Sequence, residues 1–218
     1  MNDKHPVMLA YKETERHTFP LILIIGREPN NNTGSESEDR IGSIPFKEKG
    51  TRMRNGKEEK YNNAYCGFWN NSFRILAKPN GNNTSAIKEK FKERKACPII
   101  FSDASPNAIS NDLFNKDSQR KKVNSNKIKD QINKIFNQRH LLLRVKLVIF
   151  SGLGNDLYKD FKDEFKNRSK DIYSFEINEN VPFFYGTNAA GIDNAVFKNE
   201  EIFKEVYNEF IKLPILNK

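Results

Sequence analysis

An acidic and a basic side chain stand together directly after the most apolar run of the chain. Residues 21–25 are five consecutive Leu and Ile residues, and Gly26, Arg27, Glu28, Pro29 and Asn30 follow them. Such a run, bounded by Gly and Pro, is typical of a strand buried on both faces of a parallel sheet. Parallel sheets bind ligands at the carboxyl ends of their strands. We therefore expect the Arg27 guanidinium and the Glu28 carboxylate to lie where a polar ligand binds.

Three more apolar runs each lead into a short polar or glycine-containing loop. These runs are residues 98–102, 145–150 and 181–185. The loop after the first contains Asp103, the second loop starts with Ser151 and Gly152, and the third contains Asn188. Small residues let a ligand approach the backbone closely, and Gly or Ser before a helix can hold a phosphate. We expect these loops, together with residues 26–30, to form one composite site.

Helical patterns separate the four runs, so the elements alternate along the chain. They cover residues 68–77, 85–95 and 125–139, a helix with apolar residues at 153, 157, 161 and 165, and a C-terminal helix with Asn199 as its N-cap. This alternation predicts an α/β fold in which helices flank a parallel sheet. Residues 172–177 are either an edge strand or an approach segment. We expect one domain over residues 1–218, with a long polar loop at about 30–63.

The charge of the chain is strongly basic. A formal net charge of +9 and a pI near 9.4 favour a polyanionic partner. The candidate phosphate contacts are Arg52 and Arg54 in the long loop, and Lys121 and Lys122 before a helix. The alternative, a bias of composition towards Lys and Asn with all charges solvated, stays open.

Several classes of protein are disfavoured by what the sequence lacks. It has no GxGxxG and no GxxxxGK[ST] motif, which argues against a dinucleotide or nucleoside triphosphate site. Its two cysteines, Cys66 and Cys97, are too few for a four-cysteine centre, and Cys97 is expected to be a buried thiol. His17 and His140 fall outside the strand-end loops and are expected to be structural or surface residues. We expect no metal, no cofactor and no membrane partner, and a cytoplasmic location.

The loops resemble those of the uracil-DNA glycosylase superfamily, and most nearly its mismatch-specific uracil/thymine branch. The family's strand followed by a G-x-x-P-G-like motif stands here as residues 26–30, and its late N-P-S-G-L or H-P-S motif as residues 188–192. The aromatic segment that supports the flipped base is similar to residues 65–76, which include Phe68 and Trp69. Glu28, Asn30 and the pair Ala189-Ala190 depart from these motifs, which implies a remodelled pocket.

The resemblance implies a three-layer α/β/α fold with a central four-stranded, mainly parallel sheet. It implies a monofunctional, monomeric DNA glycosylase that hydrolyses the N-glycosidic bond of a base extruded from DNA. A carboxylate beside the sugar would orient water and stabilise the developing cation, with Glu28 as first choice and Asp103 as second. The resemblance also implies the other roles. Asn188 would bind the base or the water, and Ile192 would act as a wedge in the base stack. The residues around the base would be Arg27, Asn30, Phe68 and Trp69, and those against the DNA would be Ser151, Gly152 and Gly191.

Three functions stay open on this sequence. The first is a glycosylase for uracil or for a bulkier base, such as a modified cytosine of phage DNA, in repair or in antiviral defence. The second is a non-catalytic binder of damaged or modified DNA, and the third is an enzyme that acts on a free nucleoside or nucleotide. Structural roles also stay open for the two carboxylates: Glu28 can pair with Arg27 or cap a turn, and Asp103 can form an Asx-turn.

Overall fold

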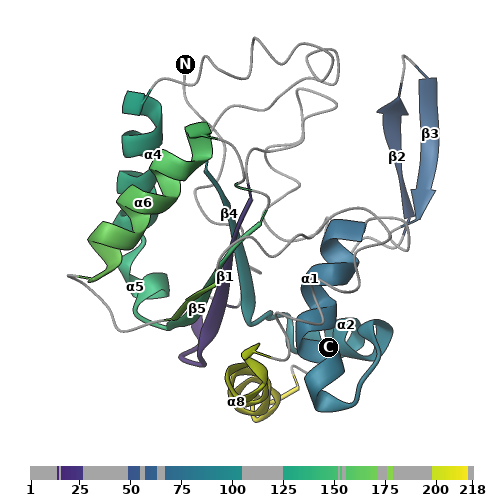
Figure 1. The fold of residues 1–218 in the computed structure, drawn as a ribbon. Coiled ribbons are helices and arrows are strands. Elements are labelled where there is room, and N and C mark those ends of the chain that lie inside the picture. The colour runs from purple at the N-terminus through teal and green to yellow at the C-terminus, as the bar shows by residue number, and fades with distance from the viewer. Residues whose placement is uncertain are drawn as a thin grey trace.

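A parallel sheet forms the centre of the computed structural model. The structure describes residues 14, 16–26, 49–54, 57–62, 67–104, 125–151, 153, 156–170, 176–178 and 198–215. The strands of the sheet are β1 (Leu21–Gly26), β4 (Ile99–Asp103), β5 (Val145–Phe150) and the short β6 (Glu176–Asn178). Their order is β4-β1-β5-β6, and every pairing is parallel (Figure 1). The α/β class predicted from the alternating pattern is confirmed.

The three long strands lie where the apolar runs predicted them. All six residues of β1 are buried, because β1 has a neighbouring strand on each side and side chains packed over both faces. The prediction for β5 is confirmed at both ends. The prediction for β4, residues 98–102, was wrong by one residue at each end, because the strand begins at Ile99 and still includes Asp103. The cause is hydrogen bonding: Asp103 is in register with Gly26, so the ladder continues to that point.

The fourth strand of the sheet is short and lies at its edge. β6 pairs with β5 through Glu176, Ile177 and Asn178. It overlaps the end of the run at 172–177, for which the sequence left an edge strand or an approach segment open, and it favours the edge strand. The predicted strand at residues 181–185 lies outside the described residues.

Helices lie on both sides of the sheet. They are α1 (Gly67–Ala77), the 3-10 turn η5 (Lys78–Asn80), α2 (Thr84–Arg94), α4 (Ser125–Asn137), α5 (Arg139–Leu142), α6 (Asp156–Lys170) and α8 (Glu200–Ile211). Figure 1 shows α1 and α2 on one side of the sheet and α4, α5 and α6 on the other. Right-handed crossovers produce this division. The connection from β1 to β4 runs across the sheet in the opposite direction to the connections from β4 to β5 and from β5 to β6, so its helices lie on the opposite face.

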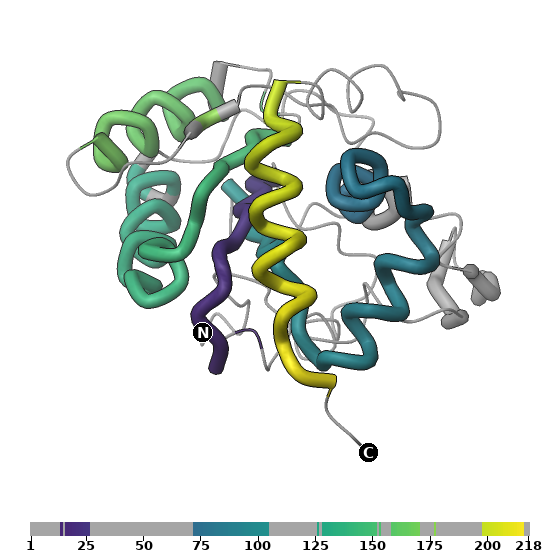
Figure 2. Tube along the Cα trace, turned by 90° about the horizontal axis from the view of Figure 1, so that it is seen from below, coloured from purple at the N-terminus to yellow at the C-terminus, as the bar shows by residue number. Residues whose placement is uncertain are grey.

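The C-terminal helix covers the end of the sheet where the strands begin. Figure 2, seen from below, shows α8 in front of the strands and between the two groups of helices. The Phe210 ring meets Phe19 and Phe91 edge to face, at centroid distances of 5.5 and 5.2 Å. Asn199 occupies the predicted N-cap position of α8, but its side chain makes no capping hydrogen bond. Asn83 does cap α2, where its Oδ1 accepts from the Ala86 N–H at 2.8 Å.

The helix after β5 begins later than its apolar spacing predicts. α6 starts at Asp156, so Leu153 lies before it, although Leu153 is buried as expected. Gly152 and Gly154 are poor helix formers, which is consistent with a later start. The buried face of α6 is made by Tyr158, Phe161 and Phe165 with Ser169, and the sequence pattern had not included Tyr158.

The predicted polar loop at residues 30–63 contains a β-hairpin. β2 (Lys49–Arg54) and β3 (Lys57–Asn62) pair antiparallel and form a sheet of their own. The expectation of a continuous loop was wrong because charged strands lack the apolar alternation that marks a half-buried strand. The signal was nevertheless present, since Asn55-Gly56 between the two strands is the commonest hairpin dipeptide.

Candidate functional site

The order of the strands places a topological switch point beside the end of β1. The chain leaves β1 towards β4 on one side, and it leaves β5 towards β6 on the other. Ligands of open α/β sheets bind at such a point, outside the carboxyl ends of the two strands that diverge. Gly26 ends β1 and Ser151 directly follows β5, so these two residues mark the switch point.

Hydrogen bonds hold the ends of three strands together. The Ala104 N–H donates to the Gly26 carbonyl, and the Ser151 N–H donates to the Ile25 carbonyl, both at 2.8 Å. The ladder therefore continues to Gly26 on the β4 side of β1 and to Ile25 on the β5 side. Because backbone groups paired in this way move little, the ends of these three strands form a rigid edge.

The carboxylate of Asp103 lies over the backbone of Gly26. A Cβ atom built on Gly26 would come within 2.9 Å of Asp103 Oδ1, which is closer than real Cβ atoms approach. The side chain of Asp103 is partly exposed. Glycine at position 26 thus leaves room for the Asp103 carboxylate, at the position that directly precedes Arg27 and Glu28 in the sequence.

A buried amide on α4 holds the end of β4. Gln131, only 5% exposed, donates from Nε2 to the main-chain carbonyl of Asp103 at 2.9 Å. The sequence analysis missed this residue. Its signal was a polar side chain on the apolar stripe of that helix, three residues after Ile128 and beside Ile132, where burial demands a hydrogen-bond partner.

Three helices direct their amino-terminal ends towards the same edge of the sheet. Figure 1 shows that α1, α4 and α6 run opposite to the strands, so each begins near the end where the strands finish. Helix dipoles place partial positive charge at these ends, which favours an anionic ligand. Phe68 and Trp69 are in the first turn of α1, as the sequence predicted.

The structure brings together only part of the predicted site. Asp103 lies at the strand ends, and so does Ser151, which is only 8% exposed and whose N–H is used within the sheet. Arg52 and Arg54 lie on β2, in register with Glu59 and Lys57, rather than in a loop. The predicted residues that lie outside the described ones are Arg27, Glu28, Asn30, Lys121, Lys122, Gly152, Asn188, Gly191 and Ile192.

The buried thiol lies away from the strand ends. Cys97 precedes β4, is 2% exposed, and exchanges two hydrogen bonds with the Thr14 hydroxyl, at 3.0 and 3.1 Å. Burial raises the pKa of the Cys97 thiol to about 12, so it is protonated and unreactive at neutral pH. The expectation of a buried thiol is confirmed. His140 is exposed, and His17 lies against Phe19, at a ring-centroid distance of 5.9 Å.

Neither known protein families nor curated proteins supply a relative for this chain. No family model matches it, and no curated protein matches it either. Among the described residues, no group of three or more His, Cys, Asp or Glu side chains has the geometry of a metal site. None of the helices in the described ranges is both long and apolar enough to cross a membrane. The geometry of the strand ends is therefore the main guide to function.

Proposed function

We propose that the protein is a DNA glycosylase that hydrolyses the N-glycosidic bond of a base flipped out of DNA. The observation that carries the proposal is the Asp103 carboxylate above Gly26, at the rim of the sheet formed by the carboxyl ends of β4 and β1. Glu28 follows Gly26 by two residues in the sequence, and the proposal assigns a second carboxylate of this rim to it. The parallel sheet with helices on both sides is compatible with the three-layer fold that the resemblance implies.

Two carboxylates at this rim suit the chemistry of glycosidic cleavage. As the base departs, positive charge develops on the sugar and negative charge on the base. A carboxylate beside the sugar orients the attacking water and stabilises the cation. In this proposal Glu28 takes that role, with Asp103 as the alternative, and Asn188 binds the departing base or the water. Reaction by either carboxylate needs no cofactor.

The remaining residues of the proposal hold the base and the DNA. Phe68 or Trp69, at the start of α1, stacks on the extruded base, and such stacking is worth about 1–3 kcal/mol. Arg27 and Asn30 line the base pocket, and Ile192 fills the space that the base leaves in the stack. The net charge of +9 supplies affinity for the phosphate backbone.

The departures from the family motifs bear on the substrate. Ala189 and Ala190 are smaller than the Pro and Ser of the late motif, which suits a base larger than uracil. We therefore propose that the substrate is either uracil itself or a larger base, a modified cytosine. Release of a phage-type modified base would support antiviral defence, and release of uracil alone would support repair.

The test is abasic-site formation on a panel of DNA substrates, with variants of both carboxylates. The panel holds uracil, mismatched thymine and modified cytosines, in single and double strands. Removing the carboxylate that orients water is expected to slow base release about 10²–10⁴-fold, so Glu28→Gln and Asp103→Asn show which one acts. Asp130→Asn, an exposed carboxylate on α4, is the matched control and is expected to keep full activity.

Other outcomes of the same panel would overturn the proposal. Full activity in both variants would remove the assigned mechanism. Saturable, salt-sensitive DNA binding without base release from any substrate would identify a non-catalytic binder. Turnover of free nucleosides without affinity for DNA would identify an enzyme of nucleoside metabolism.

A further inference from the structure

On helix α6, the basic and the acidic side chains fall on different sides of the helix. Its buried stripe contains Tyr158, Phe161 and Phe165. At 100° per residue, the lysines of α6 fall along one flank of this stripe, and the acids fall on the outer face of the helix. The lysines are Lys159, Lys162, Lys166 and Lys170, and the acids are Asp156, Asp160, Asp163 and Glu164. We call the four lysines the lysine flank.

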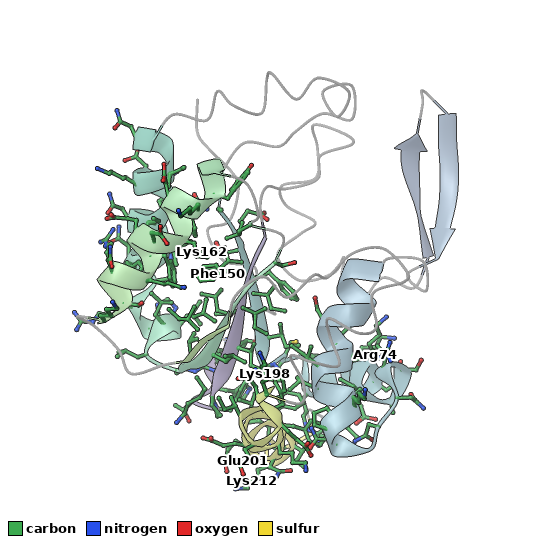
Figure 3. All side chains as sticks on the ribbon, in the orientation of Figure 1. Arg74, Phe150, Lys162, Lys198, Glu201 and Lys212 are labelled. Carbon is green, nitrogen blue, oxygen red and sulfur yellow. The ribbon has the colours of Figure 1, made fainter. Side chains whose placement is uncertain are left out.

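The other flank of α6 is already occupied by α4. Arg168 lies over the ring of Phe136, 4.8 Å from its centroid, and donates to Asn133 Oδ1. Phe165 also contacts the Phe136 ring, at a centroid distance of 5.0 Å. By the same spacing, the lysine flank therefore lies on the side of α6 opposite Arg168. Figure 3 shows the two helices side by side and labels Lys162 on α6.

The lysines are close enough to repel one another. Lys162, Lys166 and Lys170 occupy successive turns about 6 Å apart, and the whole flank is about 16 Å long at 1.5 Å per residue. Burial lowers the pKa of the Lys166 ammonium, repulsion from Lys162 and Lys170 lowers it further, and Asp163 acts in the opposite sense. A polyanion alongside would relieve this repulsion.

The flank also starts beside the candidate site. α6 follows β5, so it begins near the carboxyl ends of the strands and runs away from them (Figure 1). Lys159 and Lys170, at the two ends of the flank, are exposed, while Lys162 and Lys166 are half-buried. A DNA strand presents one phosphate per 3.4 Å of helix axis, so about five phosphates match the length of the flank.

We propose that the lysine flank of α6 binds the phosphate backbone of DNA beside the strand-end site. The inference rests on the proposed function, because it takes DNA as the substrate. It adds a contact surface in the described part of the chain. The lysine flank positions the DNA, while the strand-end site selects the base.

The test measures how binding of a fluorescein-labelled, undamaged duplex depends on salt. For the variant in which all four lysines become Gln, the slope of log K against log[salt] is expected to fall in magnitude by about 3–4, since each phosphate contact contributes about 0.9. A smaller variant, Lys159→Gln with Lys170→Gln, changes only the exposed ends and is expected to lower the slope by about 2. A four-fold Lys→Arg variant keeps the charge and is expected to bind like the wild type.

The matched control removes the same number of positive charges elsewhere. It changes Lys92, Lys146, Lys204 and Lys212 to Gln, each of which is paired with a glutamate on α2 or α8. Circular dichroism melts check that every variant is folded. A loss of slope in the α6 variants alone supports the inference. Equal losses in the α6 and control variants overturn it, because net charge would then explain the binding. A wild-type protein that does not bind DNA at any salt concentration overturns the proposed function itself.

Discussion

Gly26 and Asp103 are coupled at the scale of single residues. Gly26→Ala puts a methyl group 2.9 Å from the present position of Asp103 Oδ1, so the carboxylate has to turn away. Because Oδ1 is the end of a side chain that can rotate, we expect a stability loss of only about 1 kcal/mol. If Asp103 is the acting carboxylate, base release falls as far as in Asp103→Asn, and the double variant is no slower than either single one. Melting curves and abasic-site assays on the three variants check this.

Gln131 is likewise coupled to Asp103, through a side-chain hydrogen bond. Gln131→Met keeps the volume but removes the hydrogen bond to the Asp103 carbonyl, which is expected to cost about 1–2 kcal/mol of unfolding free energy. Urea titration gives that loss, and Gln138→Met, at a half-buried residue, serves as the control. A loss no larger than that of the control would show that Gln131 does not hold the end of β4.

The pKa of Cys97 makes stability depend on pH in the alkaline range. Burial raises the folded-state pKa to about 12 from its ordinary value of 9.0. Above pH 9 the unfolded chain loses the thiol proton while the folded chain keeps it, so the stabilisation is complete below pH 9 and is lost as pH rises towards 12. The loss amounts to about 1.4 kcal/mol per pH unit in that window. Urea titrations from pH 8 to about 11 check this, and Cys97→Ala is expected to lack this part of the slope.

A chemical probe gives an independent check on the same residue. With Cys66 replaced by Ser, a thiolate-specific reagent at pH 8 is expected to label the remaining cysteine only after urea unfolds the protein. Rapid labelling of the folded variant would show that Cys97 is accessible.

At the scale of elements, Phe210 is an aromatic anchor of α8. Phe210 is fully buried between Phe19 and Phe91. Phe210→Ala is expected to lower the unfolding free energy by about 3–5 kcal/mol, through lost burial and a residual cavity. Ile215→Ala, at a residue that is 54% exposed, is the control and is expected to stay within about 0.5 kcal/mol of wild type in urea unfolding.

The hairpin is the element whose removal is expected to change the core least. β2 and β3 pair with each other and not with the main sheet. A variant that replaces Lys49–Asn62 with a short Gly-Ser linker is expected to keep a cooperative unfolding transition. If Arg52 and Arg54 contact phosphates, the salt slope for DNA binding falls in magnitude by about 2 in this variant. An unchanged slope would remove both residues from the DNA-binding set.

At the scale of the whole molecule, one aromatic cluster and the strand-end site lie at different ends of the sheet. Phe210 packs on Phe19 and Phe91 where the strands begin, whereas the Asp103 carboxylate lies where the strands end. Arg144 also lies at the starting end, where it donates to the carbonyls of Phe19 and Thr14 at 3.0 and 2.9 Å. Burial lowers the pKa of this guanidinium to about 10, so it stays charged at neutral pH. The strand-end site can therefore vary without disturbing the contacts among Phe19, Phe91 and Phe210.

The sequence by itself determined the helices and the main strands, because the spacing of apolar residues along a segment reflects which of its side chains are buried. Uninterrupted apolar runs marked β1, β4 and β5, and four-residue spacing marked the helices. The same reasoning missed the hairpin, whose strands are charged, and it began α6 too early.

Only the tertiary structure decided which groups meet. The order β4-β1-β5-β6 brings Asp103 beside Gly26 across an interval that no local pattern spans. The packing of α4 on α6 assigned Arg168 to one flank and left the lysines on the other. The bond from Gln131 likewise joins two segments that the sequence keeps apart. These contacts depend on strand order and crossover direction, which are properties of the whole chain, whereas the periodicity of a segment depends on that segment alone.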